Sequence, residues 1–130
     1  MGAPNEIEEA LPLIQAIPDR QLINLVGKLD LLTTIEVIAL CDMYIGNDSG
    51  LMHIAAASEV PTLGLFGPSK DEHYAPRGGK YTATVRTKLS YQQLVGQPGY
   101  DHRSTGTLMN SLTVDMVETA ATKLWNKVKN

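Results

Sequence analysis

The fold of this chain follows from residues 43–67, MYIGNDSGLMHIAAASEVPTLGLFG. A short apolar run is followed there by a polar turn, a stretch of small residues and a second apolar run. Apolar runs bounded by turn residues are typical of strands, and the small residues between them have the length of a helix. The segment therefore predicts a strand at Met43–Gly46, a helix at Gly50–Ser58 and a strand at Pro61–Phe66.

The turn in this segment has the chemistry of a phosphate site. A polar turn at the carboxyl end of a strand, opening a helix, is where α/β proteins bind phosphates. Asp48 or Ser49 can cap the helix, and Gly50 lets an anion approach bare backbone N–H groups. His53 lies one helical turn past Ser49 and can share its face. The same residues also fit an ordinary helix cap and turn, so both interpretations stay open at this point.

The rest of the chain alternates helical and strand patterns. Amphipathic helices are predicted at Glu6–Ile17, where Pro12 must bend or restart the helix, and at Thr113–Val128, with Val114 among the inward residues. The Thr33 and Glu36 spacing predicts a capping box. Further strands are predicted at Leu22–Val26 and, edge-like, at Tyr81–Arg86, whereas Ser90–Asn110 is predicted to be irregular. Such alternation predicts an α/β fold with a doubly wound, Rossmann-like parallel sheet in a single domain, residues 1–130.

Composition excludes several classes of protein. The net charge of -3 and the 5% aromatic content give no reason to expect a nucleic-acid partner. The one cysteine, Cys41, excludes an internal disulfide and is predicted to be a buried thiol. No apolar run is long enough for a membrane span, and the N-terminus has no signal-peptide core, so we expect a cytoplasmic protein. His73 and His102 are predicted to be exposed, and no histidine pair has the spacing of metal ligands.

The central segment also resembles a known family. It is similar to the nucleotide-sugar signature of glycosyltransferase family 9, the ADP-heptose lipopolysaccharide heptosyltransferases. The positions that match, at the family's spacing, are Asp48, Ser49, Gly50, His53, Ala55, Ala56, Pro61, Phe66, Gly67 and Pro68. The resemblance implies a chain similar to part of the C-terminal, donor-binding half of a two-domain (GT-B type) enzyme. The acceptor-binding half and the first two strands of the donor half would then lie outside this sequence.

The resemblance implies roles for particular residues. Asp48, Ser49, Gly50 and His53 would form the donor diphosphate site. There His53 would stabilise charge on the leaving group, and Asp48 would orient the turn or meet the sugar or a bound cation. Glu6 resembles the family glutamate that binds the ribose hydroxyls. The alternative is a structural role, because the helix dipole favours a glutamate in the first turn of a helix. Lys28 and Leu29 resemble the family segment that lies along the adenine of the donor. The alternative is that Lys28 is an ordinary surface lysine. Gly67-Pro68-Ser69 resembles a turn at the floor of the family's cleft.

Three rival interpretations differ in class. A serine hydrolase is disfavoured because Gly46 stands three residues before Ser49, where the nucleophile elbow needs two. The sugar-nucleotide 2-epimerases carry a similar Asp-Ser-Gly turn, but normally with a second glycine where this chain has Leu51. A non-catalytic nucleotide-binding domain remains the third interpretation.

The resemblance implies a parent enzyme that transfers a sugar, most simply a heptose, from a nucleoside diphosphate donor to a glycolipid acceptor in lipopolysaccharide core synthesis. It requires no cofactor and no metal, and it leaves room for peripheral membrane contact. No catalytic residue is assigned, because the family's base lies on the other half, so this chain alone should transfer no sugar. The missing strands would separate Leu22–Val26 from Met43–Gly46. Either Leu22–Val26 moves to pair directly with Met43–Gly46 or a second chain fills the gap, and we expect a homo-oligomer.

Overall fold

A computed structural model describes residues 1–101 and 108–130 of the chain. These residues form two compact units, Met1–Val37 and Ile38–Asn130. His102, which the sequence predicted to be exposed, lies outside the described residues.

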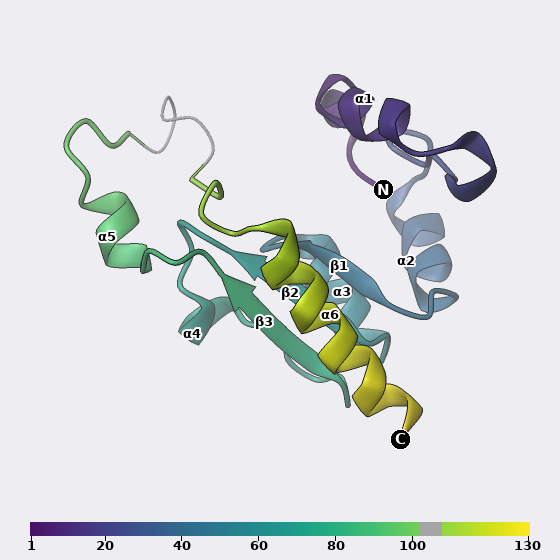
Figure 1. Cartoon of the computed structure of the whole chain (residues 1–130). Helices are drawn as coiled ribbons and strands as arrows, with labels where there is room; N and C mark the ends of the chain where they lie inside the picture. The colour runs from purple at the N-terminus through teal and green to yellow at the C-terminus, as the bar shows by residue number, and fades with distance from the viewer. Residues whose placement is uncertain (102–107) are drawn as a thin grey trace. The chain divides into compact units, whose positions relative to one another are not determined.

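The second unit contains a parallel three-stranded sheet (Figure 1). Its strands are β1 (Tyr44–Asn47), β2 (Thr62–Phe66) and β3 (Thr82–Arg86), in the order β1-β2-β3. Asn47 pairs with Leu65, and Phe66 pairs with Arg86, so the strands end at one edge of the sheet. The predicted α/β fold with a parallel sheet is confirmed, and β3 is an edge strand as its sequence indicated.

Two helices cover the two faces of this sheet. Helix α3 (Gly50–Ala57) contacts β1 and β2, whereas α6 (Val114–Lys129) contacts β2 and β3. Figure 1 shows α6 in front of the sheet and α3 behind it. Ala55 and Ala56 are fully buried, and their small side chains let α3 lie close to the strands. The largest fully buried side chains of the core are Phe66, Ile38, Met52, Leu63 and Thr62.

A short helix follows each of the last two strands: α4 (Asp71–Tyr74) follows β2, and α5 (Tyr91–Val95) follows β3. The prediction of irregular structure is therefore wrong for α5. The Ser90 hydroxyl accepts the Gln93 amide at 3.3 Å, and the Gln93 side chain accepts the Ser90 amide at 2.9 Å. This reciprocal cap starts the helix. Five residues are too few to show the apolar periodicity of a helix, so the sequence pattern did not predict it.

Helix α6 begins after Thr113, whose hydroxyl accepts the Met116 amide. Leu124 is buried in this helix, but Val114 is 80% exposed, so its predicted inward position is wrong. Val114 lies about 80° around the helix from Leu124 and at its first residue, off the stripe that packs on the sheet. Among the described residues, no helix has the length and apolar character that crossing a membrane requires.

The first unit contains α1 (Ile7–Ala16), preceded by the 3-10 turn η1 (Pro4–Glu6) and followed by η2 (Asp19–Gln21). Pro12 lies inside α1, and the helix continues through it. The predicted strand at Leu22–Val26 is wrong, because its one pairing within the described residues is an isolated parallel bridge between Val26 and Gly2. Pairing stops there since Pro4 begins a 3-10 turn and has no N–H to donate.

Helix α2 (Leu31–Ala39) starts earlier than its sequence suggested. The Asp30 carboxylate accepts the Thr33 amide at 2.8 Å and the Thr33 hydroxyl at 3.1 Å, so Asp30 caps the helix and the predicted Thr33–Glu36 box is wrong. These two bonds hold the pKa of Asp30 below its usual value. The helix ends before Cys41, which is exposed rather than buried because it lies in the turn that follows.

Gly27 occupies a tight turn that approaches the start of the first unit. Its φ is +68°, and a Cβ there would lie 2.9 Å from Pro4 Cα. Gly78 has a φ of +95°, and a Cβ there would have no atom within 4 Å. A side chain at Gly78 would therefore strain the backbone, as at Gly27, but would not clash with a neighbour.

We expect Gly78→Ala to lower the free energy of unfolding by about 1 kcal/mol through its positive φ alone. Gly27→Ala should cost more, about 2–4 kcal/mol, because Pro4 must also move. Urea unfolding of both variants measures the difference. Equal losses would contradict the close approach of Gly27 to Pro4.

Candidate functional site

The predicted phosphate turn lies where β1 ends and α3 begins. Asp48 and Ser49 connect Asn47, the last residue of β1, to Gly50, the first residue of α3. Because β1 and β2 are parallel, this turn and the loop after Phe66 emerge at the same edge of the sheet. Ligands of open α/β sheets bind outside the carboxyl ends of the strands, so the turn has the right place for a ligand.

Ser49 is the N-cap residue of α3, but its hydroxyl does not cap the helix. Its backbone is extended, with φ -153° and ψ 168°, and its side chain makes no capping hydrogen bond. The Ser49 carbonyl accepts the Met52 amide at 3.1 Å and the His53 amide at 3.4 Å. The exposed hydroxyl is therefore available to a ligand at the positive end of the helix.

Gly50 gives that ligand open access to the backbone. It is exposed, and a Cβ built on it would meet no atom within 4 Å. Nothing among the described residues therefore requires a glycine at this position. The first two amides of α3, those of Gly50 and Leu51, have no acceptor within the helix, and the open space at Gly50 gives a ligand access to them.

Asp48 and His53 face each other across the turn. His53 Nε2 lies 3.9 Å from Asp48 Oδ1, and the two side chains are 48% and 21% exposed. This separation is longer than a hydrogen bond, so the two side chains are close neighbours with no direct bond between them. Asp48 and Ser49 lie on the turn, whereas Gly50 and His53 lie in the first turn of α3, so the four predicted diphosphate residues lie together.

Glu6 has a structural role in the first unit. Its Oε2 accepts the Ala3 amide at 2.5 Å and so closes the 3-10 turn at the start of the chain. Glu6 is exposed, and a carboxylate has two oxygens that can each accept more than one hydrogen bond. Binding of ribose by this carboxylate stays a prediction.

Lys28 and Leu29 follow the Gly27 turn. The Gly27 amide donates to the Gly2 carbonyl at 2.9 Å, so the segment before Lys28 lies beside the segment that leads to Glu6. Lys28 is exposed and Leu29 is half-buried. The structure therefore brings the predicted ribose and adenine segments together within the first unit, and their ligands stay predictions.

A hollow of about 440 Å³ lies beyond the end of β2. Sequence analysis singled out part of its wall, the Gly67-Pro68-Ser69 turn, but missed the aromatic side chains. They come from two short helices that the sequence pattern did not place together. The lining residues are Pro68, Ser69, Lys70, His73, Tyr74 and Tyr91.

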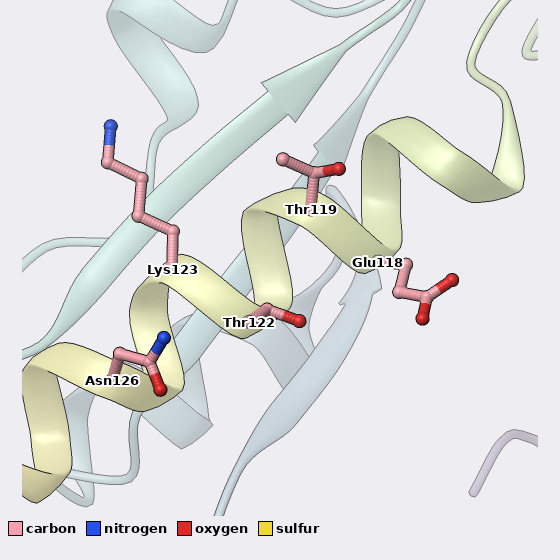
Figure 2. Close-up of a pocket in the computed structure, with 5 residues that line it drawn as sticks. All are labelled: Glu118, Thr119, Thr122, Lys123 and Asn126. Atoms are coloured by element: carbon pink, nitrogen blue, oxygen red, sulfur yellow. The ribbon is translucent and has the colours of Figure 1, made fainter.

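A second hollow, of about 480 Å³, lies along α6 (Figure 2). All of its lining side chains are exposed and all come from this one helix. It is therefore an open helix face rather than an enclosed site. The residues are Glu118, Thr119, Thr122, Lys123 and Asn126. Within residues 1–101 and 108–130, no three His, Cys, Asp or Glu side chains gather as metal ligands would.

The sequence model of glycosyltransferase family 9 (heptosyltransferase) matches residues 1–98. The chain belongs to glycosyltransferase family 9. The match covers the phosphate turn, the Glu6 and Lys28 segments and the hollow beyond β2, and it ends before α6. The resemblance found in the sequence is therefore confirmed.

Curated relatives in family 9 are heptosyltransferases. The chain is 41% identical over 92 residues to "Lipopolysaccharide heptosyltransferase 2" of Salmonella typhimurium, covering 71% of this chain and 25% of the relative. It is 41% identical over 71 residues to "Lipooligosaccharide heptosyltransferase 2" of Haemophilus influenzae, covering 52% and 20%. The chain thus spans a quarter or less of these relatives.

Solved structures from family 9 share the fold. The E. coli ADP-heptose lps heptosyltransferase II aligns with a TM-score of 0.75 at 25% identity, over 99% of this chain and 36% of that one. A family 9 glycosyl transferase from Veillonella parvula aligns with a TM-score of 0.77 at 24% identity, over 97% and 35%. These alignments confirm the α/β fold and its relation to the glycosyltransferases.

Proposed function

We propose that this chain is the donor-binding part of a glycosyltransferase of lipopolysaccharide core synthesis, and that its donor is a nucleoside diphosphate sugar, ADP-heptose in the first place. The observation that carries the proposal is the open space in front of Gly50, at the start of a helix. The heptosyltransferase names of the relatives support the choice of sugar and pathway.

The phosphate turn suits a diphosphate for three physical reasons. The helix N-terminus carries partial positive charge, its first amides point outward, and the Ser49 hydroxyl is not used in capping. Gly50 presents no side chain that would hold the phosphate oxygens away from those amides. The diphosphate would therefore bind mainly to backbone.

His53 would act when the donor bond breaks. Transfer breaks the bond between the anomeric carbon of the sugar and the diphosphate oxygen, and the bonding electron pair leaves with the diphosphate. An imidazole N–H aimed at that oxygen stabilises the charge as it develops. Asp48, 3.9 Å from His53, would orient the ring, which explains an acidic residue beside an anion site.

The remaining partners belong to the same proposal. Glu6 would accept the ribose hydroxyls, while Lys28 and Leu29 would lie along the adenine through their backbone. The acceptor is a glycolipid bound by another part of the enzyme, which also provides the base and meets the membrane at its periphery. Since reaction needs both substrates held in one geometry, the chain by itself should transfer no sugar.

Calorimetric titration with ADP, UDP and GDP tests the donor site. We expect weak binding, with ADP preferred. Gly50→Val should abolish it by blocking the approach to the backbone, although the open space around Gly50 lets the fold accept valine. His53→Ala should weaken it about 10- to 100-fold, the loss of one charge-assisted hydrogen bond worth roughly 1.5–3 kcal/mol.

Ala57→Val is the matched control, because Ala57 is exposed at the opposite end of the same helix. It should bind ADP as the unmodified chain does. Equal affinity in the parent chain and in folded Gly50→Val and His53→Ala would reject the assignment of the phosphate turn. A preference for UDP would point to another sugar-nucleotide enzyme.

We also propose that the chain self-associates through the edge of β1. β1 is an edge strand of the sheet, and its Ile45 side chain is 46% exposed. Exposed edges with apolar side chains favour pairing with another chain. Sedimentation over a range of concentrations should show a dimer or larger species, and a monomer at every concentration would contradict this proposal.

A further inference from the structure

One arginine holds both ends of the loop that follows β2. Arg86, the last residue of β3, forms an ion pair with the Asp71 carboxylate through Nη1. Its Nη2 donates to the Gly67 carbonyl at 3.1 Å. Gly67 comes directly after β2, and Asp71 is the first residue of α4. The guanidinium therefore closes residues 67–71 into a loop whose tip is Pro68-Ser69-Lys70.

Further contacts order this loop. Gly67 is buried, and a Cβ on it would clash with Met109 Sδ and lie 3.4 Å from Thr87 Cγ2. At the other end of the loop, the His73 amide donates to the Lys70 carbonyl at 3.0 Å. Because the loop is ordered before a ligand arrives, binding at its tip costs less conformational entropy.

The tip of the loop is a neighbour of the phosphate turn. β1 pairs with β2 so that Asn47 lies opposite Leu65, and paired strands lie about 4.8 Å apart. β1 stands at the end of the strand order, and β2 is its one partner in the sheet that the described residues form. A ligand that extends from the phosphate turn toward β2 therefore meets residues 68–70.

We propose that Arg86 is a positioning residue for the donor: by holding Gly67 and Asp71 together, it places the loop tip against the sugar of the nucleoside diphosphate sugar. The inference rests on the proposed donor function. The sugar is attached to the terminal phosphate, so it lies beside the phosphate turn on the side away from the nucleoside. Ser69 in the tip is half-buried, and its hydroxyl can both donate to and accept from a sugar hydroxyl.

The chemistry of arginine suits this role. A planar guanidinium can bond to two acceptors in fixed directions, which a lysine ammonium does not do. The Arg86 and Asp71 side chains are 27% and 25% exposed, so solvent screens their charges less than it screens a surface pair. Arg86 Nε, however, is buried and has no hydrogen-bond partner in the part of the chain that the structure describes. A buried donor without an acceptor costs stability, which favours a geometric role for Arg86 over a purely stabilising one.

Calorimetric titration with ADP-heptose and with ADP tests the proposal, because only the first ligand carries the sugar. Arg86→Lys keeps the charge but cannot hold both ends of the loop, and Arg86→Gln removes the charge as well. Each should weaken binding of ADP-heptose about 3- to 10-fold, the worth of one neutral hydrogen bond, and leave binding of ADP unchanged.

The ratio of the two affinities is the readout, since partial unfolding would weaken both ligands by the same factor. Arg77→Gln is the matched control. Arg77 Nη2 also donates to a backbone carbonyl, that of Glu72 at 3.4 Å, but this carbonyl lies outside residues 67–71, so the ratio should not change. Asp71→Asn removes the ion pair and keeps the bond to Gly67, so it should lower the ratio less. This variant carries the test if Arg86→Gln does not fold.

The outcomes separate this inference from the donor function. Equal losses for ADP and ADP-heptose in the Arg86 variants, or an unchanged ratio, would overturn the positioning role. The same change of ratio in Arg77→Gln would also overturn it. If the unmodified chain binds ADP and gains no affinity from the sugar, the inference fails and the donor function stands. If it binds neither ligand, the donor function fails, and the inference fails with it.

Discussion

The parallel pairing of β1 with β2 is the constraint on which the functional parts of this chain depend. It requires a crossover, and α3 provides one whose buried Ala55 and Ala56 bring the helix close to both strands. Parallel strands end at a common edge, so the turn after Asn47 and the loop after Phe66 emerge side by side. Without that pairing neither the phosphate turn nor the hollow would have a defined position.

Two features of different chemistry lie at this edge of the sheet, the proposed diphosphate turn and the hollow beyond β2. In the proposed diphosphate site, Gly50 would contribute by having no side chain, and the helix end would supply the charge. At the hollow, the Lys70 ammonium lies over the Tyr91 ring, and Arg86 donates to the Gly67 carbonyl at the start of the loop that carries Lys70.

The sequence predicted those parts of the fold whose determinants are contiguous. The strand–turn–helix–strand unit at 43–67 was correct because its apolar runs, turn and small residues stand next to one another. Leu22–Val26 failed because a strand needs a partner, and within the described residues only Gly2 pairs with it. The start of α2 failed because Asp30 competed with Thr33 as the cap. The hollow was missed because Tyr74 and Tyr91 are far apart in the sequence and line one hollow only in the folded chain.

The central claim is that the turn after β1 holds the donor diphosphate. A crystal structure of the chain with ADP tests it most directly. The account predicts phosphate oxygens within hydrogen-bond distance of the Gly50 and Leu51 amides and the Ser49 hydroxyl, with His53 beside the terminal phosphate. A diphosphate bound elsewhere, with the space in front of Gly50 left to solvent, would contradict it.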